Sequence, residues 1–355
     1  MPCVPNWELK PYVHYRYGSD DYIFVRQNPA IFRNIHHTNT WDAGIDNIYH
    51  ASWGTIAAGI NFRNENINST NLGQRNRTNL GAFLEYQKVW EQLDVNLGLF
   101  LNHNSVFGTR VYPGLDIGYR LHPHWRIFFN AGMGQRLPTF TDLYYSGPSN
   151  IGNDQLLPEY TTSYELGIKY NEMATRATAS VFYKSGKDFI DWVRSDTAQA
   201  WQVMNFTTLN TLGAHLDFQH RFNIGAHTQL VLYTGYTYLH PEIGVPADDS
   251  KAEYLSQYAV NSLRHQWVTR VSLEVFDGLQ LGIGNRWLSR YMATNTPDQP
   301  KKTNYDLLDI RAAYQWNRFT ISADVNNAMN VRYIESGVVP LPGRWWTLGF
   351  AYQYH

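Results

Sequence analysis

A side-chain alternation with a period of two residues recurs in segment after segment of this 355-residue chain. Between Tyr164 and Tyr170 every second side chain is apolar or aromatic, and the residues between them are Glu165, Gly167 and Lys169. Successive side chains of a β-strand point to opposite faces of the sheet, so such a segment predicts a strand with one apolar and one polar face. A soluble fold must hide the apolar face, whereas a membrane barrel exposes it to lipid and keeps the polar face in its lumen.

The composition agrees with a membrane barrel, although its average resembles that of a soluble protein. Hydrophobic residues make up 43% of the chain and the mean hydropathy is −0.43, as expected when lipid-facing and lumen-facing residues are averaged. Aromatic residues reach 15%, including 25 Tyr and 12 Trp, which suits girdles at the membrane interfaces. No apolar run approaches the roughly 18 residues of a spanning helix. The net charge of −1 does not favour nucleic acid as a partner.

Turn-forming residues divide the chain into about sixteen strand candidates. Short connections, such as 119–125, 170–176, 275–279 and 315–318, alternate with long ones. The long connections are richer in Asn, Asp, Pro, Gly and Ser and cover roughly 19–37, 64–76, 137–160, 185–201, 240–260 and 290–304. Short turns on one rim and long loops on the other predict an all-β, antiparallel, up-and-down transmembrane β-barrel.

The two faces of the candidate strands separate apolar from polar residues. We expect these side chains to face outward: Val95, Leu97, Leu99, Leu101, Leu115, Ile117, Tyr119, Leu121, Ile127, Phe129, Ala131, Met133, Ala177, Ala179, Val181 and Tyr183. The inward set is Asp94, Asn96, Asp116, Arg120, Asn130, Arg176 and Lys184. In a soluble β-sandwich, propeller or solenoid, these charges would lie unpaired in a dry core at severe cost. No repeat with a period of 20–50 residues supports a propeller or solenoid either.

The start of the chain lacks the features of an export signal. The single cysteine, Cys3, excludes an intrachain disulfide framework. Residues 1–5 lead directly into a strand-like segment, without a charged region, an apolar stretch or a cleavage site. We therefore expect that the natural beginning of the protein lies upstream.

Two regions carry motifs beyond the alternation. The first contains Arg136-Leu-Pro-Thr-Phe-Thr-Asp-Leu-Tyr144, then Gly152-Asn-Asp-Gln-Leu-Leu-Pro-Glu159 and Tyr164-Glu-Leu-Gly167. The second runs from Asp324 to Tyr333 and continues with Pro340-Leu-Pro-Gly-Arg-Trp-Trp346. In these motifs and their order, the chain resembles the barrel of TonB-dependent outer-membrane receptors.

The resemblance has implications for domain organisation. Members of that family have an N-terminal plug, a short TonB-contacting box and 22 strands, so residues 1–355 are expected to be one partial barrel domain, without the plug and about six strands. Two features depart from the family pattern. The chain ends Tyr352-Gln-Tyr-His355 rather than on an aromatic residue, and the turn Asn326-Asn-Ala-Met-Asn330 is a loose version of the family's turn.

Residues of the two motif regions are expected to anchor loops rather than to bind ligand. Pro138 lacks an N–H and cannot donate a backbone hydrogen bond to a neighbouring strand, so we expect it to end the strand pairing where the strand leaves the membrane. The residues assigned to such structural roles are Arg136, Pro138, Asp142, Pro158, Glu159, Gly343 and Arg344.

Aromatic and arginine side chains in the long connections are the candidate ligand contacts. Together they could form an outer bowl that stacks on and hydrogen-bonds a bulky ligand. The candidates are Tyr22, Arg26, Phe32, Arg33, Tyr144, Tyr145, Trp192, Arg194 and Tyr254. No catalytic motif, metal-ligand spacing or cofactor fingerprint is found, so we expect no enzyme, no metal site and no cofactor.

The resemblance implies a function for the intact protein. It would be a receptor in the outer membrane of a Gram-negative bacterium, energised through TonB, that imports a scarce bulky nutrient such as a ferric siderophore or cobalamin. TonB would act through the missing plug, so this segment alone is not expected to perform gated uptake. The alternative is a passive porin, since sixteen strands is a porin-like number. An outer-membrane enzyme or adhesin is the third possibility.

Overall fold

The computed structural model of the chain forms one large, strongly curved β-sheet, and it describes residues 6–195, 198–244, 255–256, 263–276, 278–290, 304–335 and 340–354. Within these residues, sixteen strands have eight or more residues. They are β1 (Trp7–Ile23), β2 (Arg33–Ala51), β3 (Gly54–Ser69), β4 (Gly73–Val89), β5 (Leu93–Asn104), β6 (Gly108–His122), β7 (Trp125–Arg136), β9 (Glu159–Glu172), β10 (Thr175–Arg194), β11 (Trp201–Asn223), β12 (Thr228–Gly244), β14 (Leu263–Val275), β15 (Leu279–Arg290), β16 (Asn304–Trp316), β17 (Phe319–Asn326) and β18 (Trp345–Tyr352). The short elements are α1 (Phe140–Tyr144), β8 (Asn150–Ile151) and β13 (Leu255–Ser256).

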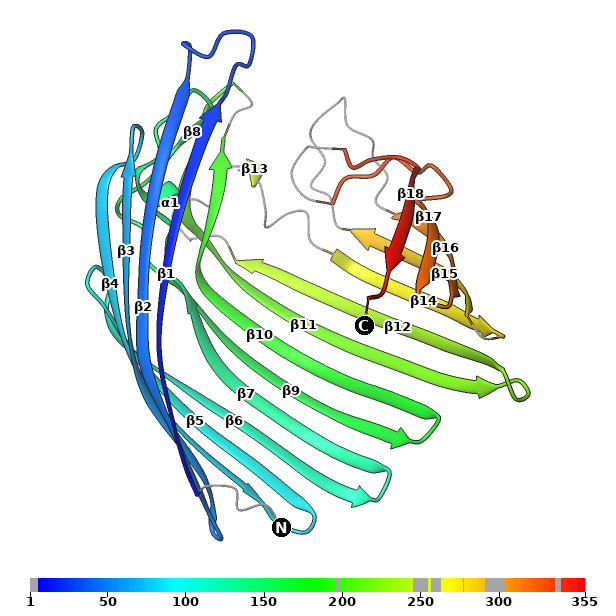
Figure 1. Cartoon of the computed structure of the whole chain (residues 1–355). Coiled ribbons are helices and arrows are strands. Elements are labelled where there is room, and N and C mark those ends of the chain that lie inside the picture. Colours follow the sequence, from blue (N-terminus) through cyan, green and yellow to red (C-terminus); the bar gives the residue numbers. More distant parts are fainter. Residues whose placement is uncertain are drawn as a thin grey trace.

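The long strands pair antiparallel in chain order, which confirms the predicted up-and-down topology. Figure 1 shows the sheet curving around a central space, with short turns at the bottom and the longer connections, α1 and β8 at the top. Within the described residues, β1 pairs only with β2 and β18 only with β17, so these two strands carry the edges of the sheet.

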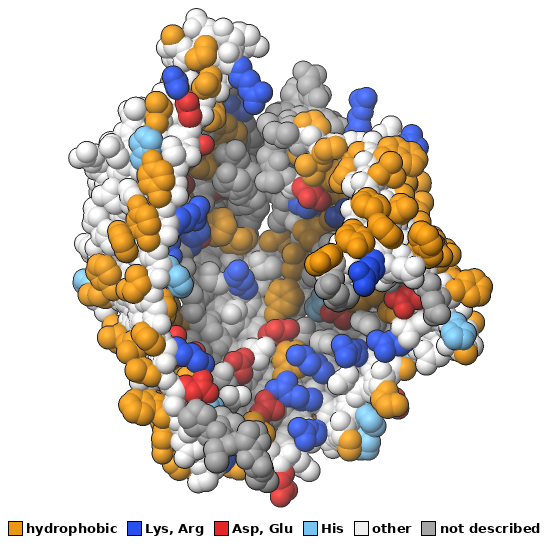
Figure 2. All heavy atoms as spheres, in the orientation of Figure 1, with side chains coloured by type: hydrophobic (Ala, Val, Ile, Leu, Met, Phe, Trp, Pro, Cys, Tyr) orange, Lys and Arg blue, Asp and Glu red, His pale blue; other side chains and the backbone are white. Residues whose placement is uncertain are grey.

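The strand register confirms the predicted faces. One row of directly opposed residues crosses β5, β6, β7, β9 and β10 as Val95, Ile117, Phe129, Leu166 and Val181. On the other face, Asn96, Asp116, Asn130 and Glu165 form a polar row. Figure 2 looks into the hollow, where acidic and basic side chains gather, while hydrophobic side chains follow the left margin over β1 and β2.

Aromatic side chains mark two levels on the outer face. Near the short turns, Trp7 lies opposite Tyr49, and Trp53 stacks on Tyr86 with ring centroids 6.2 Å apart. Higher on the same strands, Trp41 contacts Tyr15 at 4.6 Å between ring centroids. Trp41 and Tyr49 are eight residues apart on β2, which corresponds to about 27 Å along a strand. At the strand tilt of about 35–45° found in membrane barrels, the two levels are roughly 19–22 Å apart in height, somewhat less than the apolar band of about 25 Å.

Two of the predicted long loops are wrong, because strands occupy them, and a third, 19–37, is shorter than predicted, because β1 continues to Ile23 and β2 begins at Arg33. Residues 64–76 form the ends of β3 and β4, joined by a turn at 70–72. Asn64 and Asn76 exchange amide hydrogen bonds of 3.2 and 3.1 Å across these strands, so the Asn-rich composition reflects cross-strand pairing rather than a loop. In the same way, β10 continues to Arg194 through most of 185–201. The connection at 137–160 is confirmed, and the loops predicted at 240–260 and 290–304 lie mostly outside the described residues.

Lumen-facing glycines make room for neighbouring side chains. Arg126 reaches across Gly118 to pair with Asp94, and its Nε donates to the carboxylate at 3.1 Å. A β-carbon at Gly118 would lie 2.0 Å from a guanidinium nitrogen of Arg126. The missing side chain at this position therefore permits the ion pair.

The assignment of the two faces can be tested by placing the same charge on neighbouring residues of β5. Leu97→Arg exposes a guanidinium on the apolar face and should reduce the free energy of unfolding by about 2–4 kcal/mol, the cost of arginine at the middle of a bilayer. Asn96→Arg places it on the polar face, where Asp116 lies directly opposite, and should change stability little. Urea unfolding in lipid vesicles measures both, and equal losses would contradict the assignment.

Candidate functional site

The connection between β7 and β9, residues 137–158, is folded onto the rim rather than left loose. Its short helix α1 begins with a capping box. The Thr139 hydroxyl accepts a hydrogen bond from the Asp142 backbone N–H at 3.0 Å, and the Asp142 carboxylate accepts one from the Thr139 N–H at 2.9 Å. These two bonds satisfy N–H groups that a helix start otherwise leaves unpaired.

Arg136 joins the two ends of this connection. Its guanidinium donates to Glu159 Oε1 at 2.6 Å and to Asp142 Oδ2 at 3.3 Å. Both carboxylates are buried, and the hydrogen bond to Glu159 is the main reason why the pKa of Arg136 is raised. Glu159 also accepts a hydrogen bond of 2.7 Å from the backbone N–H of Ile190 in β10. One side chain therefore ties the end of β7, helix α1 and the start of β9 together.

A second arginine, Arg77 of β4, holds the connection from the opposite side. It donates to the carbonyl of the buried Pro138 at 2.8 Å and to Glu65 of β3 at 2.6 Å. Its guanidinium lies 4.9 Å from the centroid of the Phe140 ring. Sequence reasoning missed Arg77, because its partner Glu65 lay inside a segment predicted to be a loop.

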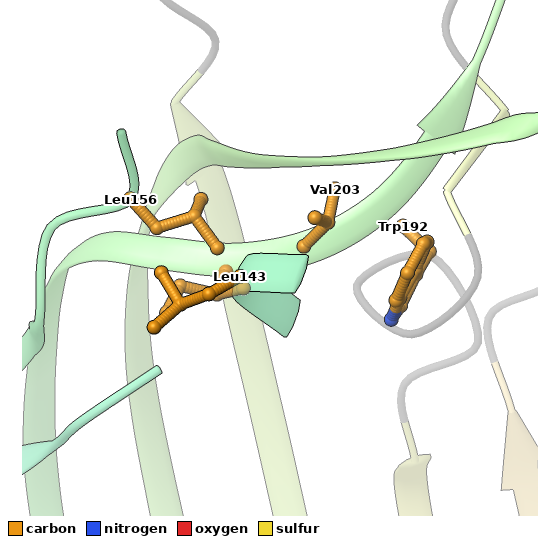
Figure 3. Close-up of a cluster of buried hydrophobic side chains, with 5 residues drawn as sticks. Leu143, Leu156, Trp192 and Val203 are labelled. Atoms are coloured by element: carbon orange, nitrogen blue, oxygen red, sulfur yellow. The ribbon is translucent and has the colours of Figure 1, made fainter. Parts of the chain in front are cut away.

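A small hydrophobic cluster lies under the connection. It consists of Leu143, Leu156, Ile190, Trp192 and Val203, which come from α1, the loop after β8, β10 and β11. Figure 3 shows Leu143, Leu156 and Val203 together, with the Trp192 ring at the other end of the cluster. Trp192 was a candidate ligand contact, and the structure places it in this cluster with 8% of its surface exposed.

A β-bulge brings β10 into this cluster. The register between β10 and β11 shifts around Gly186–Phe189, and Asp188 has a φ of 56°. Bulges bend a strand and re-aim the side chains that follow them. Asn205 of β11 stabilises the bend by donating to the carbonyls of Asp188 and Leu157, at 2.7 and 2.9 Å. Asn205 is a second residue that sequence reasoning missed.

The structure brings several of the candidate ligand contacts together as a rim aromatic cluster, made of Tyr22, Phe24, Phe32 and Tyr145. Phe32 contacts Phe24 and Tyr145 with ring centroids 6.1 and 6.4 Å apart. Burial of the Tyr145 hydroxyl raises its pKa, and the nearby Tyr22 hydroxyl adds a smaller effect in the same direction. Hydrogen bonds of 2.6 and 3.1 Å between Asn71 and Ser146 hold the turn of β3 and β4 against this cluster.

The other candidates lie around the cluster or apart from it. Tyr144 is covered by the Arg75 guanidinium, 3.9 Å from its ring centroid. Arg33 forms an exposed ion pair with Asp21 at 2.7 Å, which lowers the pKa of Asp21.

The remaining candidates are not part of the rim aromatic cluster. Arg26 is exposed in the turn after β1, and the Arg194 guanidinium lies over the Trp201 ring, 4.3 Å from its centroid. Tyr254 lies outside the described residues. Tyr22, Arg33, Trp192 and Arg194 were expected in loops but lie in strands.

The second motif region forms an ordered, hydrogen-bonded turn before β18. Asn327 and Asn330 adopt φ values of 49° and 54°, a left-handed conformation that asparagine tolerates better than most residues. The Asn330 side chain accepts a hydrogen bond of 3.0 Å from the Arg344 backbone N–H. A β-carbon at Gly343 would lie 2.5 Å from the same Asn330 oxygen, so this position requires glycine unless the turn shifts.

Two further features, a metal site and a membrane-spanning helix, were sought in the part of the chain that the structure describes. Its His, Cys, Asp and Glu side chains form no group of three or more that could hold a metal ion. None of its helices has the length and apolar character needed to cross a membrane.

The role of Arg136 can be tested against an exposed ion pair of similar geometry. Arg136→Gln leaves two buried carboxylates without their partner and should destabilise the rim by about 2–3 kcal/mol, less than a fully buried pair because Arg136 is 45% exposed. Limited proteolysis should then cut within 137–158. Arg33→Gln removes the pair with Asp21, both partners of which are about half exposed, and should change proteolysis little. Resistance of Arg136→Gln to cleavage would contradict the anchoring role.

Comparison with known proteins places the chain in a family. The model of the family "TonB dependent receptor-like, beta-barrel" matches residues 4–328. A vitamin B12 transporter BtuB of Vibrio vulnificus is 24% identical over 286 residues, which are 79% of this chain and 43% of the relative. An iron-regulated outer membrane virulence protein of Vibrio cholerae is 22% identical over 280 residues, or 72% of this chain and 41% of the relative. The chain thus spans less than half the length of these curated relatives.

Solved structures share the fold. A mutant of the ferric enterobactin receptor PfeA from Pseudomonas aeruginosa superimposes with a TM-score of 0.73 and 15% identity, covering 97% of this chain and 59% of that one. The FrpB iron transporter from Neisseria meningitidis gives a TM-score of 0.69 and 16% identity, covering 98% and 60%. Since the β-barrel model of the TonB-dependent receptors matches nearly the whole chain, this protein belongs to that family.

Proposed function

We propose that this barrel lies in the outer membrane of a Gram-negative bacterium and is the wall of a receptor that imports a scarce bulky nutrient, of the ferric siderophore or cobalamin type. Family membership supports transport as the general activity. The apolar outer face and its aromatic levels support a position in the membrane.

The observation that carries the proposal is the rim aromatic cluster above the polar hollow. Tyr22, Phe24, Phe32 and Tyr145 present partly exposed rings. Two arginines follow or cover residues next to them in the chain, since Arg33 follows Phe32 and Arg75 lies over the ring of Tyr144. Aromatic faces stack on planar groups, and arginine donates to carboxylates or phenolates, so this surface suits a large ligand with both features. A porin needs no such surface, because small solutes pass it by diffusion.

The hollow below the rim supports a passage for a polar cargo. Its ion pairs join neighbouring strands in Arg286–Asp309 at 3.7 Å and Arg311–Asp324 at 3.5 Å, while Arg126–Asp94 reaches from β7 across β6 to β5. We propose that in the whole protein a plug domain fills this hollow and receives the energy from TonB. In that arrangement residues 1–355 would form part of the barrel domain, and gated uptake would require the plug and the remaining strands as well.

Uptake by cells tests the proposed function directly. The natural full-length protein that contains this barrel is produced in a bacterium whose own cobalamin and siderophore receptors have been deleted. Uptake of labelled cobalamin, and of labelled iron from a panel of ferric siderophores, is then measured with and without functional TonB. We expect uptake of one of these cargo classes, and only when TonB works. Entry of small sugars at the same rate in both strains, without cargo uptake, would support the porin instead.

The rim aromatic cluster gives a second, residue-level prediction. The double variant Phe32→Ala and Tyr145→Ala removes two contacting rings and should weaken cargo binding about tenfold or more, since each buried aromatic anchor contributes about 1 kcal/mol or more. Trp41→Ala, which removes an aromatic ring from the membrane-facing surface of β2, is the matched control and should leave affinity unchanged. Equal affinity of the double variant and wild type in equilibrium binding would exclude this cluster from the binding site.

A further inference from the structure

The barrel wall contains a seam between β6 and β7. Pairing between these strands runs from the short turn up to Gly114–Gly132 and stops there, although β6 extends to Gly108 and β7 to Arg136. Above that point, β6 pairs only with β5, and β7 pairs only with β9. All of these residues lie in the described part of the chain. In a membrane wall, such an interruption is costly unless something else satisfies or covers the freed backbone groups.

The seam has a physical cause in the anchoring of the two strands. The upper end of β7 is drawn toward β9 and β10 by Arg136, which binds Glu159. The upper end of β6 is held toward β4 by Ser105, which exchanges hydrogen bonds of 2.9 and 3.0 Å with Thr78. Pro113 lies between these anchors and has no N–H to offer to either neighbour. The strands therefore diverge above Gly114.

A cavity of about 370 Å³ lies at the seam. It is lined by residues of both faces of the sheet, among them Leu99, Pro113 and Met133 of the outer face and Phe100 and Tyr112 of the inner face. Gly132 and Gly134 also line it, and a β-carbon at either position would meet no atom within 4 Å. Two of its lining residues, Leu99 and Met133, are exposed on the apolar outer surface. Beyond Tyr112 on the same strand, Arg110 donates from its Nε to the Tyr160 hydroxyl of β9 at 3.2 Å.

One polar group in this cavity has no partner. The hydroxyl of Tyr112 is buried and makes no hydrogen bond within the described structure. A buried hydroxyl without a partner is destabilising, so it indicates a ligand that carries one acceptor. The cavity lining also contains Glu85, but its larger side chains, among them Phe83, Phe100 and Met133, are apolar, which favours a ligand that is otherwise apolar. The volume is at the lower end of the roughly 300–1,000 Å³ of small-molecule sites.

We propose that the seam between β6 and β7 is a lateral lipid site, which admits the ester-linked acyl chain of a membrane lipid from the bilayer. The chain lies against Phe100, Pro113 and Met133, and the Tyr112 hydroxyl donates to its ester carbonyl. The level of the seam agrees with this occupant. Met133 is eight residues above Trp125, which is at the short-turn end of β7. At a strand tilt of about 35–45° this is a rise of roughly 19–22 Å, which places Met133 in the upper part of an apolar band of about 25 Å.

The test is photocrosslinking in a defined membrane, and it rests on the membrane position assigned under the proposed function. The full-length protein is reconstituted in vesicles of phosphatidylethanolamine and phosphatidylglycerol that contain a trace of phospholipid with a diazirine in one acyl chain. After irradiation, adducts are located by peptide mass spectrometry. We expect adducts on Phe100 and Tyr112, whose side chains belong to the inner face and are otherwise shielded from lipid.

Variants that fill the seam or remove its polar group sharpen the test. Gly132→Leu, or Gly134→Leu if the first fails to fold, should lower labelling of Phe100 and Tyr112 about tenfold, because the new side chain occupies the cavity. Gly284→Leu is the matched control, a glycine of β15 where a β-carbon would meet only Arg270 at 3.9 Å, and should label like wild type. Tyr112→Phe should lower labelling of Phe100 about fivefold, as expected for one lost hydrogen bond.

The results that would overturn the lipid site differ from those that would overturn the membrane position of the barrel. Adducts on Leu99, Pro113 and Met133 without adducts on Phe100 and Tyr112 would show a closed wall in a correctly placed barrel. Undiminished labelling of Phe100 in both glycine variants would also exclude the seam as the route. Absence of adducts even on Leu97 and Leu166 of the outer face would contradict the membrane position itself, and the lipid site with it.

Discussion

Backbone hydrogen bonding in a medium without water is the constraint on which this structure depends. Inside a bilayer, each N–H and C=O must find its partner in a neighbouring strand, because lipid tails offer none. The long antiparallel pairings from β1 to β18 meet that requirement across most of the wall. The side chains are then free to divide by polarity alone, which explains why outer and inner rows follow the register so closely.

Outside the bilayer a different set of interactions takes over. There the strands continue as a ribbon in water, and polar side chains can pair across it, as Asn64 and Asn76 do. The connection at 137–158 is held by ion pairs whose carboxylates are buried, by a capping box and by a small hydrophobic cluster. This combination makes the rim a firm platform, on which aromatic rings from separate connections can be brought together.

The sequence predicted the parts of the structure that depend on local pattern. The two-residue alternation predicted which side chains lie on the apolar face and which on the polar face, and the short turns predicted the hairpins. Both signals are local, because the polarity of a side chain in a strand matches the medium that its face contacts. The rim was less predictable, since its contacts join residues far apart in the chain. Arg77 holds Pro138 across 61 positions, and Asn205 holds Leu157 across 48. Asn-rich strand ends also give the same local signal as loops, which is why 64–76 was assigned incorrectly.

The contact between Phe32 and Tyr145 is an example of a feature that could not be predicted from the sequence. Both residues were candidates for ligand contact on composition alone, but their contact depends on the Asn71–Ser146 hydrogen bonds between two connections. The seam between β6 and β7 was also not apparent in the sequence. Pro113 was the only local signal for it, and proline also occurs at bulges, at strand starts and along ordinary sheet edges.

The length of β10 and β11 has a consequence for how the protein meets membranes of different thickness. These strands contain 20 and 23 residues, about twice the number needed to cross a bilayer at a tilt. The bulge at Asp188 lies thirteen positions from Thr175, the short-turn end of β10, about two to four residues beyond the roughly 9–11 needed for crossing. A change of a few ångströms in hydrocarbon thickness would therefore move the water boundary along the strands below the bulge and the hydrophobic cluster. Within that margin, the strands themselves absorb hydrophobic mismatch, and the geometry of the rim does not change with the lipid composition.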